Sequence, residues 1–173
     1  MTGSFESSFP ASGLFARLKG LIARPADTIS DEYAHDRVQL AVCVLLLEVA
    51  EADDEFSAQE RHYVRDALAS RFSLDRHEVE SLMGAARERR AESVDLWHFT
   101  HEINESWSRD EKLAFMEEIW RLIYADGTLS GHEDYLVHQL ATLLNLAHPD
   151  LIQAKREVLR HRLRESLTSP IAS

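Results

Sequence analysis

Two short acidic segments of the sequence are built alike and contain the residue types of an ion-binding site. EADDEFSAQE covers residues 51–60, and YADGTLSGHE covers residues 124–133. Both follow the pattern Ala-Asp-x-x-apolar-Ser-x-x-Glu. The matching residues are Ala52, Asp53, Phe56, Ser57 and Glu60 in the first segment and Ala125, Asp126, Leu129, Ser130 and Glu133 in the second. Carboxylates at this spacing either bind a hard cation or belong to two helix ends that are alike for structural reasons.

The Ser and Glu of each segment are explained by helix capping. A Ser-x-x-Glu capping box satisfies free backbone N–H groups at a helix start and needs no ion. The chain contains a control for this pattern, because Ser108 and Glu111 form the same box while Asn104 occupies the position of the Asp. The box alone therefore does not predict a metal.

The Asp of each segment is different, because Asp53 and Asp126 fall where a long helix is expected to end. The helix dipole disfavours a negative charge there by about 0.3–1 kcal/mol, and a nearby positive charge would offset that cost. An Asp leaving one helix and a Glu in the first turn of the next can converge on one small volume, which suits Ca²⁺ or Mg²⁺. Asp-Gly at 126–127 is also a favourable turn, so turn formation is an alternative role for Asp126.

The two segments are not EF-hand loops. An EF-hand needs a bidentate Glu at its twelfth position, where this chain has Val64 and Val137. Neither segment supplies enough oxygen ligands alone, so we predict a weak site that is completed by water or shared between the two segments. The candidate ligands are Asp53, Glu55, Glu60, Asp126 and Glu133.

Apolar residues recur at helical spacing along nearly the whole chain, and no alternating strand pattern occurs. We expect a short helix at 14–23 and a long apolar helix at 31–52. The later helices are expected to begin at Ser57, Asp75, Ser93, Ser108, Ser130 and Pro149, and the last of them to end at about Arg164. The sequence thus predicts an all-α protein with a single compact domain of about eight helices. This domain covers 14–165, between a mobile N-terminal segment at 1–13 and a flexible C-terminal tail at 166–173.

The similarity between the two segments extends into the flanking helices. Leu46, Leu47 and Val49 align with Ile119, Trp120 and Leu122, and Val64 aligns with Val137. A long apolar helix, an acidic corner and an amphipathic helix therefore occur twice, which predicts an internal pseudo-twofold repeat.

Composition limits the classes of partner. Lys and Arg total 19 against 30 Asp and Glu, a net charge of −11. This charge disfavours nucleic acid and suits cations or a basic protein surface. The one cysteine, Cys43, lies in an apolar run and is expected to be a small buried hydrophobe. The run 40–49 is about half the length of a membrane span, and the N-terminus has no signal-peptide pattern, so we expect a cytoplasmic protein without a transmembrane segment.

Three further patterns give weaker predictions. His98 and His101 share a helix face but lack a third zinc ligand at suitable spacing. His148-Pro149-Asp150 is expected to begin a helix. The basic helix at 14–24 either docks on its own domain, which we favour, or lies on an anionic membrane.

The paired corners in an acidic, all-helical chain resemble the TerB-like (tellurite-resistance) family, whose domain also forms the N-terminal part of certain membrane-bound DnaJ-type co-chaperones. The resemblance covers residues 31–163. It implies a divalent-cation site at Asp53, Glu60, Asp126 and Glu133, although Asp54 replaces the usual glycine of the first corner. It also implies a protein without enzymatic activity that acts as a stress-response sensor or scaffold near the membrane.

Three functions remain open from the sequence. The first is a non-enzymatic TerB-like module that binds a divalent cation and another protein. The second is a pure protein-interaction or oligomerisation module in which the corners serve only as helix caps. The third is a metal-dependent hydrolase, which would need an open pocket beside the acidic corners.

Overall fold

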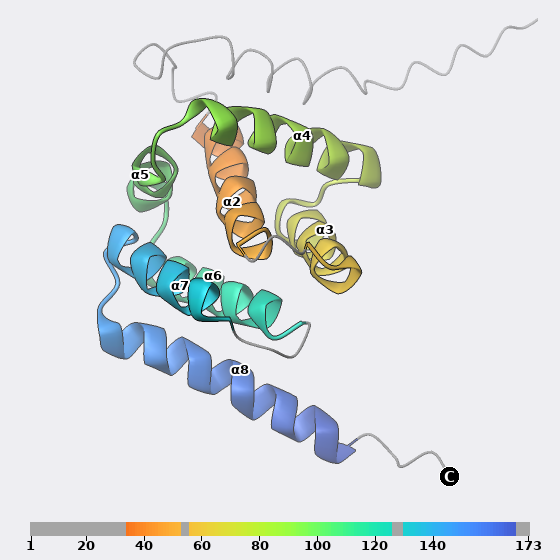
Figure 1. Ribbon diagram of the computed structural model, residues 1–173, viewed down its shortest axis with the longest axis vertical. Helices are drawn as coiled ribbons and strands as arrows, with labels where there is room; N and C mark the ends of the chain where they lie inside the picture. Colours follow the sequence, from red (N-terminus) through yellow and green to blue (C-terminus); the bar gives the residue numbers. More distant parts are fainter. Residues whose placement is uncertain (1–33, 53–55, 126–129, 169–173) are drawn as a thin grey trace, which may run out of the picture.

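A computed structural model describes residues 34–52, 56–125 and 130–168. In these ranges the chain is helical and contains no strand, which confirms the predicted all-α class (Figure 1). The helices are α2 (Ala34–Ala50), α3 (Ala58–Phe72), α4 (Arg76–Glu92), α5 (Trp97–Ser106), α6 (Arg109–Ile123), α7 (Gly131–Leu143) and α8 (His148–Thr168). The helix predicted at 14–23, the segment 1–13 and residues 169–173 lie outside the described ranges, so the total of eight helices stays a prediction.

Helix α2 lies at the centre of the domain, and α3, α4, α5, α6 and α7 all contact it (Figure 1). Thirteen of its 17 residues are buried, as expected for a helix that is apolar on all sides. Cys43 is fully buried within it, and desolvation raises the pKa of its thiol. The prediction that Cys43 is a small buried hydrophobe is confirmed.

Helix α8 packs along α6 and extends past its end (Figure 1). Its buried side is formed by Leu151, Ala154 and Val158, and the ammonium of Lys155 lies 4.7 Å from the ring centroid of the buried Trp120. The helix continues to Thr168, the last described residue, past the predicted end at about Arg164. Arg, Leu and Glu are good helix formers, so the helix continues although these last turns lack a buried face.

The predicted capping boxes are confirmed at Ser57, Asp75, Ser108 and Ser130. In each of them the cap side chain accepts from the backbone N–H three residues later, and the Glu at that position accepts from the cap N–H.

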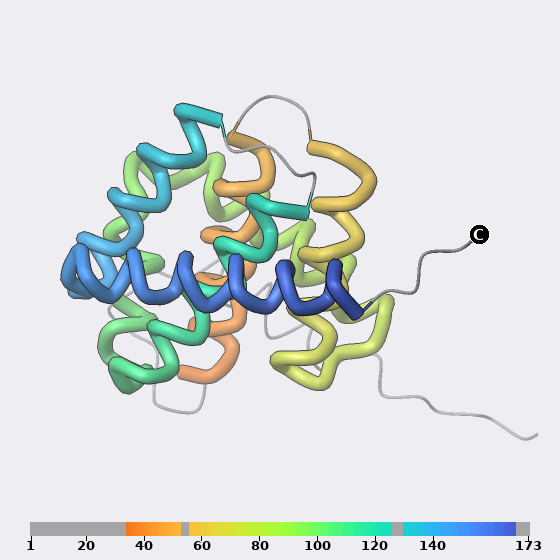
Figure 2. Tube along the Cα trace, turned by 90° about the horizontal axis from the view of Figure 1, so that it is seen from below, coloured from red at the N-terminus to blue at the C-terminus, as the bar shows by residue number. Residues whose placement is uncertain are grey.

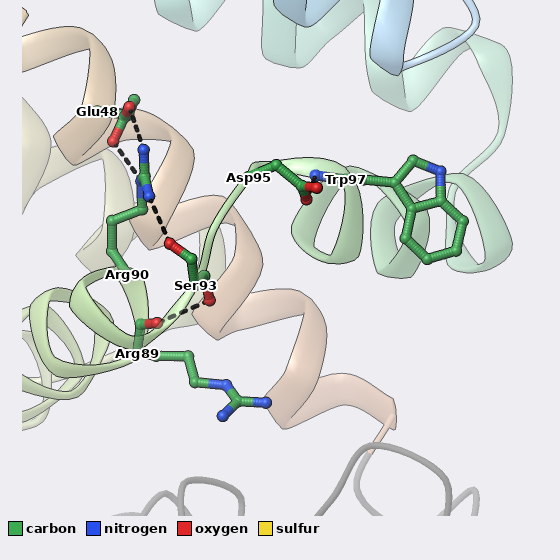
Figure 3. Close-up of polar contacts among 6 residues, drawn as sticks. All are labelled: Glu48, Arg89, Arg90, Ser93, Asp95 and Trp97. Atoms are coloured by element: carbon green, nitrogen blue, oxygen red, sulfur yellow. Dashed lines mark hydrogen bonds and ion pairs between the residues drawn. The ribbon is translucent and has the colours of Figure 1, made fainter.

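The predicted helix start at Ser93 is wrong. Ser93 ends α4: its hydroxyl donates to the carbonyl of Arg89, and its own carbonyl accepts from Arg90 (Figure 3). Arg90 is held in turn by two hydrogen bonds to Glu48 of α2, of 2.7 and 2.8 Å. Helix α5 begins at Trp97, whose N–H donates to Asp95. A serine can bond a helix C-terminal carbonyl as well as a helix N-terminus, and only the fold decides which of these it does.

Candidate functional site

The two acidic segments form the connections between α2 and α3, the first corner (residues 51–60), and between α6 and α7, the second corner (residues 124–133). Figure 2 shows the C-terminal ends of α2 and α6 and the N-terminal ends of α3 and α7 on the same side of the domain. Of the five predicted ligands, Glu60 and Glu133 lie in the described ranges, and Asp53, Glu55 and Asp126 lie outside them.

The two described glutamates have the same local geometry. In the first corner, Ser57 N–H donates to Glu60 Oε2 at 2.8 Å and Glu60 N–H donates to Ser57 Oγ at 3.1 Å. In the second corner, Ser130 N–H donates to Glu133 Oε2 at 2.6 Å and Glu133 N–H donates to Ser130 Oγ at 3.1 Å. Each carboxylate therefore accepts the N–H of its cap serine and is fixed in the first turn of its helix.

Burial distinguishes these two glutamates from those of the other capping boxes. Glu60 and Glu133 are each 1% exposed, whereas Glu78 is half-buried and Glu111 is exposed. Hydrogen bonds from the N–H and hydroxyl of Ser108 lower the pKa of Glu111, so an exposed glutamate completes this box well. Capping therefore does not require burial. Burying a carboxylate is costly unless charge or hydrogen bonding compensates it.

The position of each Glu on its helix explains why it is buried. Glu60, Val64 and Leu68 are the buried residues of α3 and follow one another at intervals of four, which places them on one helix face. Glu133 and Val137 begin the same pattern in α7. The valines that replace the twelfth EF-hand ligand are both fully buried. Each carboxylate therefore extends an apolar, core-facing stripe by one turn.

Arginines approach both corners. Arg61 lies with its guanidinium carbon 5.1 Å from the ring centroid of Phe56, and Arg87 bonds Glu51 at 3.0 Å. In the second corner, Arg162 of α8 donates to the carbonyl of Tyr124, just after the end of α6. Positive charge at a helix C-terminus offsets the helix dipole without any ion. The positions of Arg87 and Arg162 could not be predicted from the sequence, because these side chains reach the corners only through tertiary packing.

The control corner between α5 and α6 has its own positive charge. Lys112 is nearly buried, and its ammonium donates to Asn104 Oδ1 at 3.1 Å and to the carbonyl of Leu144 at 2.9 Å. Asn104 also donates to the carbonyl of Leu143 at 2.8 Å. The neutral amide at the position of the Asp therefore belongs to a hydrogen-bond network that ties α5 and α6 to the end of α7.

A cavity of about 450 Å³ adjoins the second corner between α3, α6 and α8. Its lining residues are Tyr63, Arg121, Tyr124, Ala125, Arg162, Glu165 and Ser166. Burial, assisted by the negative charge of Glu118, raises the pKa of Tyr63 to about 12, so its phenol is neutral at pH 7. Glu165 is the one carboxylate in the described lining, and Asp126, the residue after Ala125, lies outside the described ranges.

No group of three or more His, Cys, Asp or Glu in the described ranges is arranged to hold a metal. Those ranges include two of the five predicted ligands, so the ligand set stays a prediction. His98 and His101 are both exposed, and His101 stacks on Trp97 with ring centroids 4.7 Å apart. No helix in the described ranges is long and apolar enough to cross a membrane.

The fold and its corners define an all-helical domain with two similarly built acidic connections. The family model "Tellurite resistance protein TerB" matches residues 39–156, which is more than half of the chain. The chain belongs to the TerB family, as the resemblance of its corners indicated. Among curated proteins and among solved structures, no match was found.

Proposed function

We propose that this protein is a non-enzymatic, cytoplasmic TerB module whose paired corners bind a divalent cation and thereby shape a surface for another protein. The proposed ligands are Asp53, Glu55 and Glu60 in the first corner and Asp126 and Glu133 in the second. Ca²⁺ or Mg²⁺ fits this all-oxygen set. A sensor or scaffold near the membrane in a stress response is the role that fits such a module.

The burial of Glu60 and Glu133 is the observation that carries the proposal. The same helix position is a buried carboxylate in the two corners that contain an Asp and an exposed one in the corner that contains Asn104. The corner without the Asp instead contains the nearly buried Lys112. A cation beside Asp53 and Asp126 would contact the buried carboxylate of Glu60 and offset the charge of the acids that follow the two helices.

The arginines near the corners favour a second candidate, a pure protein-interaction or oligomerisation module. In that case Arg61, Arg87 and Arg162 supply the positive charge, and the Asp residues serve only as turn or capping groups. This candidate needs no ion, and a chelator would leave both the fold and partner binding unchanged.

Calorimetric titration distinguishes the two candidates. The chelator-treated full chain is titrated with Ca²⁺, Mg²⁺, Mn²⁺ and Zn²⁺ and compared with a variant that combines Asp53→Asn and Asp126→Asn. We expect binding of a hard cation by the wild type and a loss of at least about tenfold in affinity for the variant, because each carboxylate ligand contributes charge to the site. Absence of binding by the wild type would exclude the ion and leave the interaction module.

A further inference from the structure

The last turns of α8 have a second apolar stripe that the fold does not use. From Leu159 to Thr168 every residue of the helix is exposed. Leu159, Leu163 and Leu167 follow one another at intervals of four and are 38%, 66% and 86% exposed. At about 100° per residue, Leu159 lies roughly 90° around the helix from Leu151 and Val158, which pack on the domain, Leu163 roughly 130° and Leu167 roughly 170°. The stripe therefore turns progressively away from the protein toward the end of the helix, as the rising exposure of the leucines shows.

Basic residues flank this stripe in a chain that is acidic overall. Arg156, Arg160 and Arg164 lie along one side of the leucines at the same four-residue interval, and Lys155 and Arg162 lie along the other. Within the described ranges Arg160 pairs with Glu157, and no ion pair is found for Arg156 or Arg164. The segment 155–168 contains five Lys or Arg and two Glu, so its net charge is positive, whereas the net charge of the whole chain is −11.

We propose that the end of α8 is a contact surface for an anionic membrane. The three leucines would enter the boundary between headgroups and acyl chains, while Arg156 and Arg164 bind phosphate groups. The helix runs past the end of α6, so its outer side can lie on a flat surface without contact between that surface and the rest of the domain (Figure 1). The TerB family match ends at residue 156, before the three leucines.

Charge and area favour a membrane over the other occupants. If the stripes of two copies packed on each other, the flanking arginines of both copies would be neighbours, and their like charges would repel. Three leucines also supply far less than the roughly 800 Å² per partner that a stable protein interface buries. Membrane contact needs only a short apolar stripe combined with attraction to anionic lipid.

Vesicle co-sedimentation of the full chain tests the proposal. Phosphatidylcholine vesicles are compared with vesicles that also contain about 30% phosphatidylglycerol, at low and high salt. We expect binding to the anionic vesicles that weakens as salt increases. Combined Leu163→Ser and Leu167→Ser should lower the partition coefficient about tenfold, and so should combined Arg156→Gln and Arg164→Gln.

The controls are Val94→Ser, which removes a fully exposed apolar side chain elsewhere, and Arg76→Gln, which removes an exposed charge from α4. Both should bind as the wild type does, and circular dichroism should show that all variants are folded. The proposal is wrong if the wild type does not bind anionic vesicles, or if the α8 variants bind them as well as the wild type. It is also wrong if the leucine changes abolish a dimer seen by light scattering while vesicle binding is unchanged.

Discussion

At the scale of single residues, the corners contain glutamates whose burial exceeds what their capping role needs. Glu60 and Glu111 make the same two cap hydrogen bonds, yet Glu60 is 1% exposed and Glu111 is exposed. Comparing these two glutamates within one protein separates the effect of the cap hydrogen bonds on the free energy of unfolding from the effect of a buried charge.

We predict that Glu60→Gln removes the stabilisation by a divalent cation, whereas Glu111→Gln does not. Glutamine also completes a capping box, so both variants keep the cap. A cation at 100 times its Kd raises the unfolding free energy by about 2.7 kcal/mol, and only a variant that loses a ligand should lose this gain. Thermal unfolding of the wild type and both variants, each with Ca²⁺ and with chelator, measures the difference. Equal behaviour of the two variants would mean that Glu60 is a cap and not a ligand.

At the scale of elements, the helix starts show which features local sequence can predict. The boxes at Ser57, Asp75, Ser108 and Ser130 were predictable, because a cap and its Glu are three residues apart and interact within one turn. Ser93 has no Glu or Gln three residues later, and its hydroxyl bonds the preceding helix. The prediction failed where the helix-start signal was a lone serine.

The sequence could indicate which side chains are buried on a helix, but not which distant residues they contact. The spacing of Glu60 to Val64 and of Glu133 to Val137 could have indicated buried carboxylates, because it extends an apolar stripe. The approach of Arg162 to the end of α6 could not have been predicted, since it depends on how α8 crosses the domain. The role of Lys112 likewise requires the carbonyl of Leu144, which lies 32 residues away along the chain.

We predict that Lys112→Met lowers the unfolding free energy by about 1–3 kcal/mol. Methionine leaves the buried carbonyl of Leu144 and the Oδ1 atom of Asn104 without their donor. Arg76→Met, at an exposed site, is the control and should change stability by no more than about 0.5 kcal/mol. Urea unfolding of both variants, with Asn104→Ala added to complete a double-mutant cycle, gives the coupling between the two side chains. If Lys112→Met changed the unfolding free energy as little as Arg76→Met does, the hydrogen bonds of Lys112 would not stabilise the fold, contrary to the prediction.

At the scale of the whole molecule, the domain places two similar corners on one side, and the exposed end of α8 reaches the second of them through Arg162 (Figure 2). The central α2 ends in the first corner, and α6, which supports α8, ends in the second. A cation bound at both corners would therefore lie beside the C-terminal ends of α2 and α6, the two helices on which the other helices pack.

A crystal structure of the protein grown with Mn²⁺ tests the ion-binding claim most directly, because Mn²⁺ prefers the same oxygen ligands and is visible by anomalous scattering. We predict an anomalous peak at the corners with carboxylate oxygens of Asp53 or Asp126 about 2.0–2.6 Å away and with Glu60 or Glu133 in the same coordination sphere. A structure with no anomalous peak at either corner, in which Asp53 and Asp126 instead contact guanidinium or backbone N–H groups, would contradict the account.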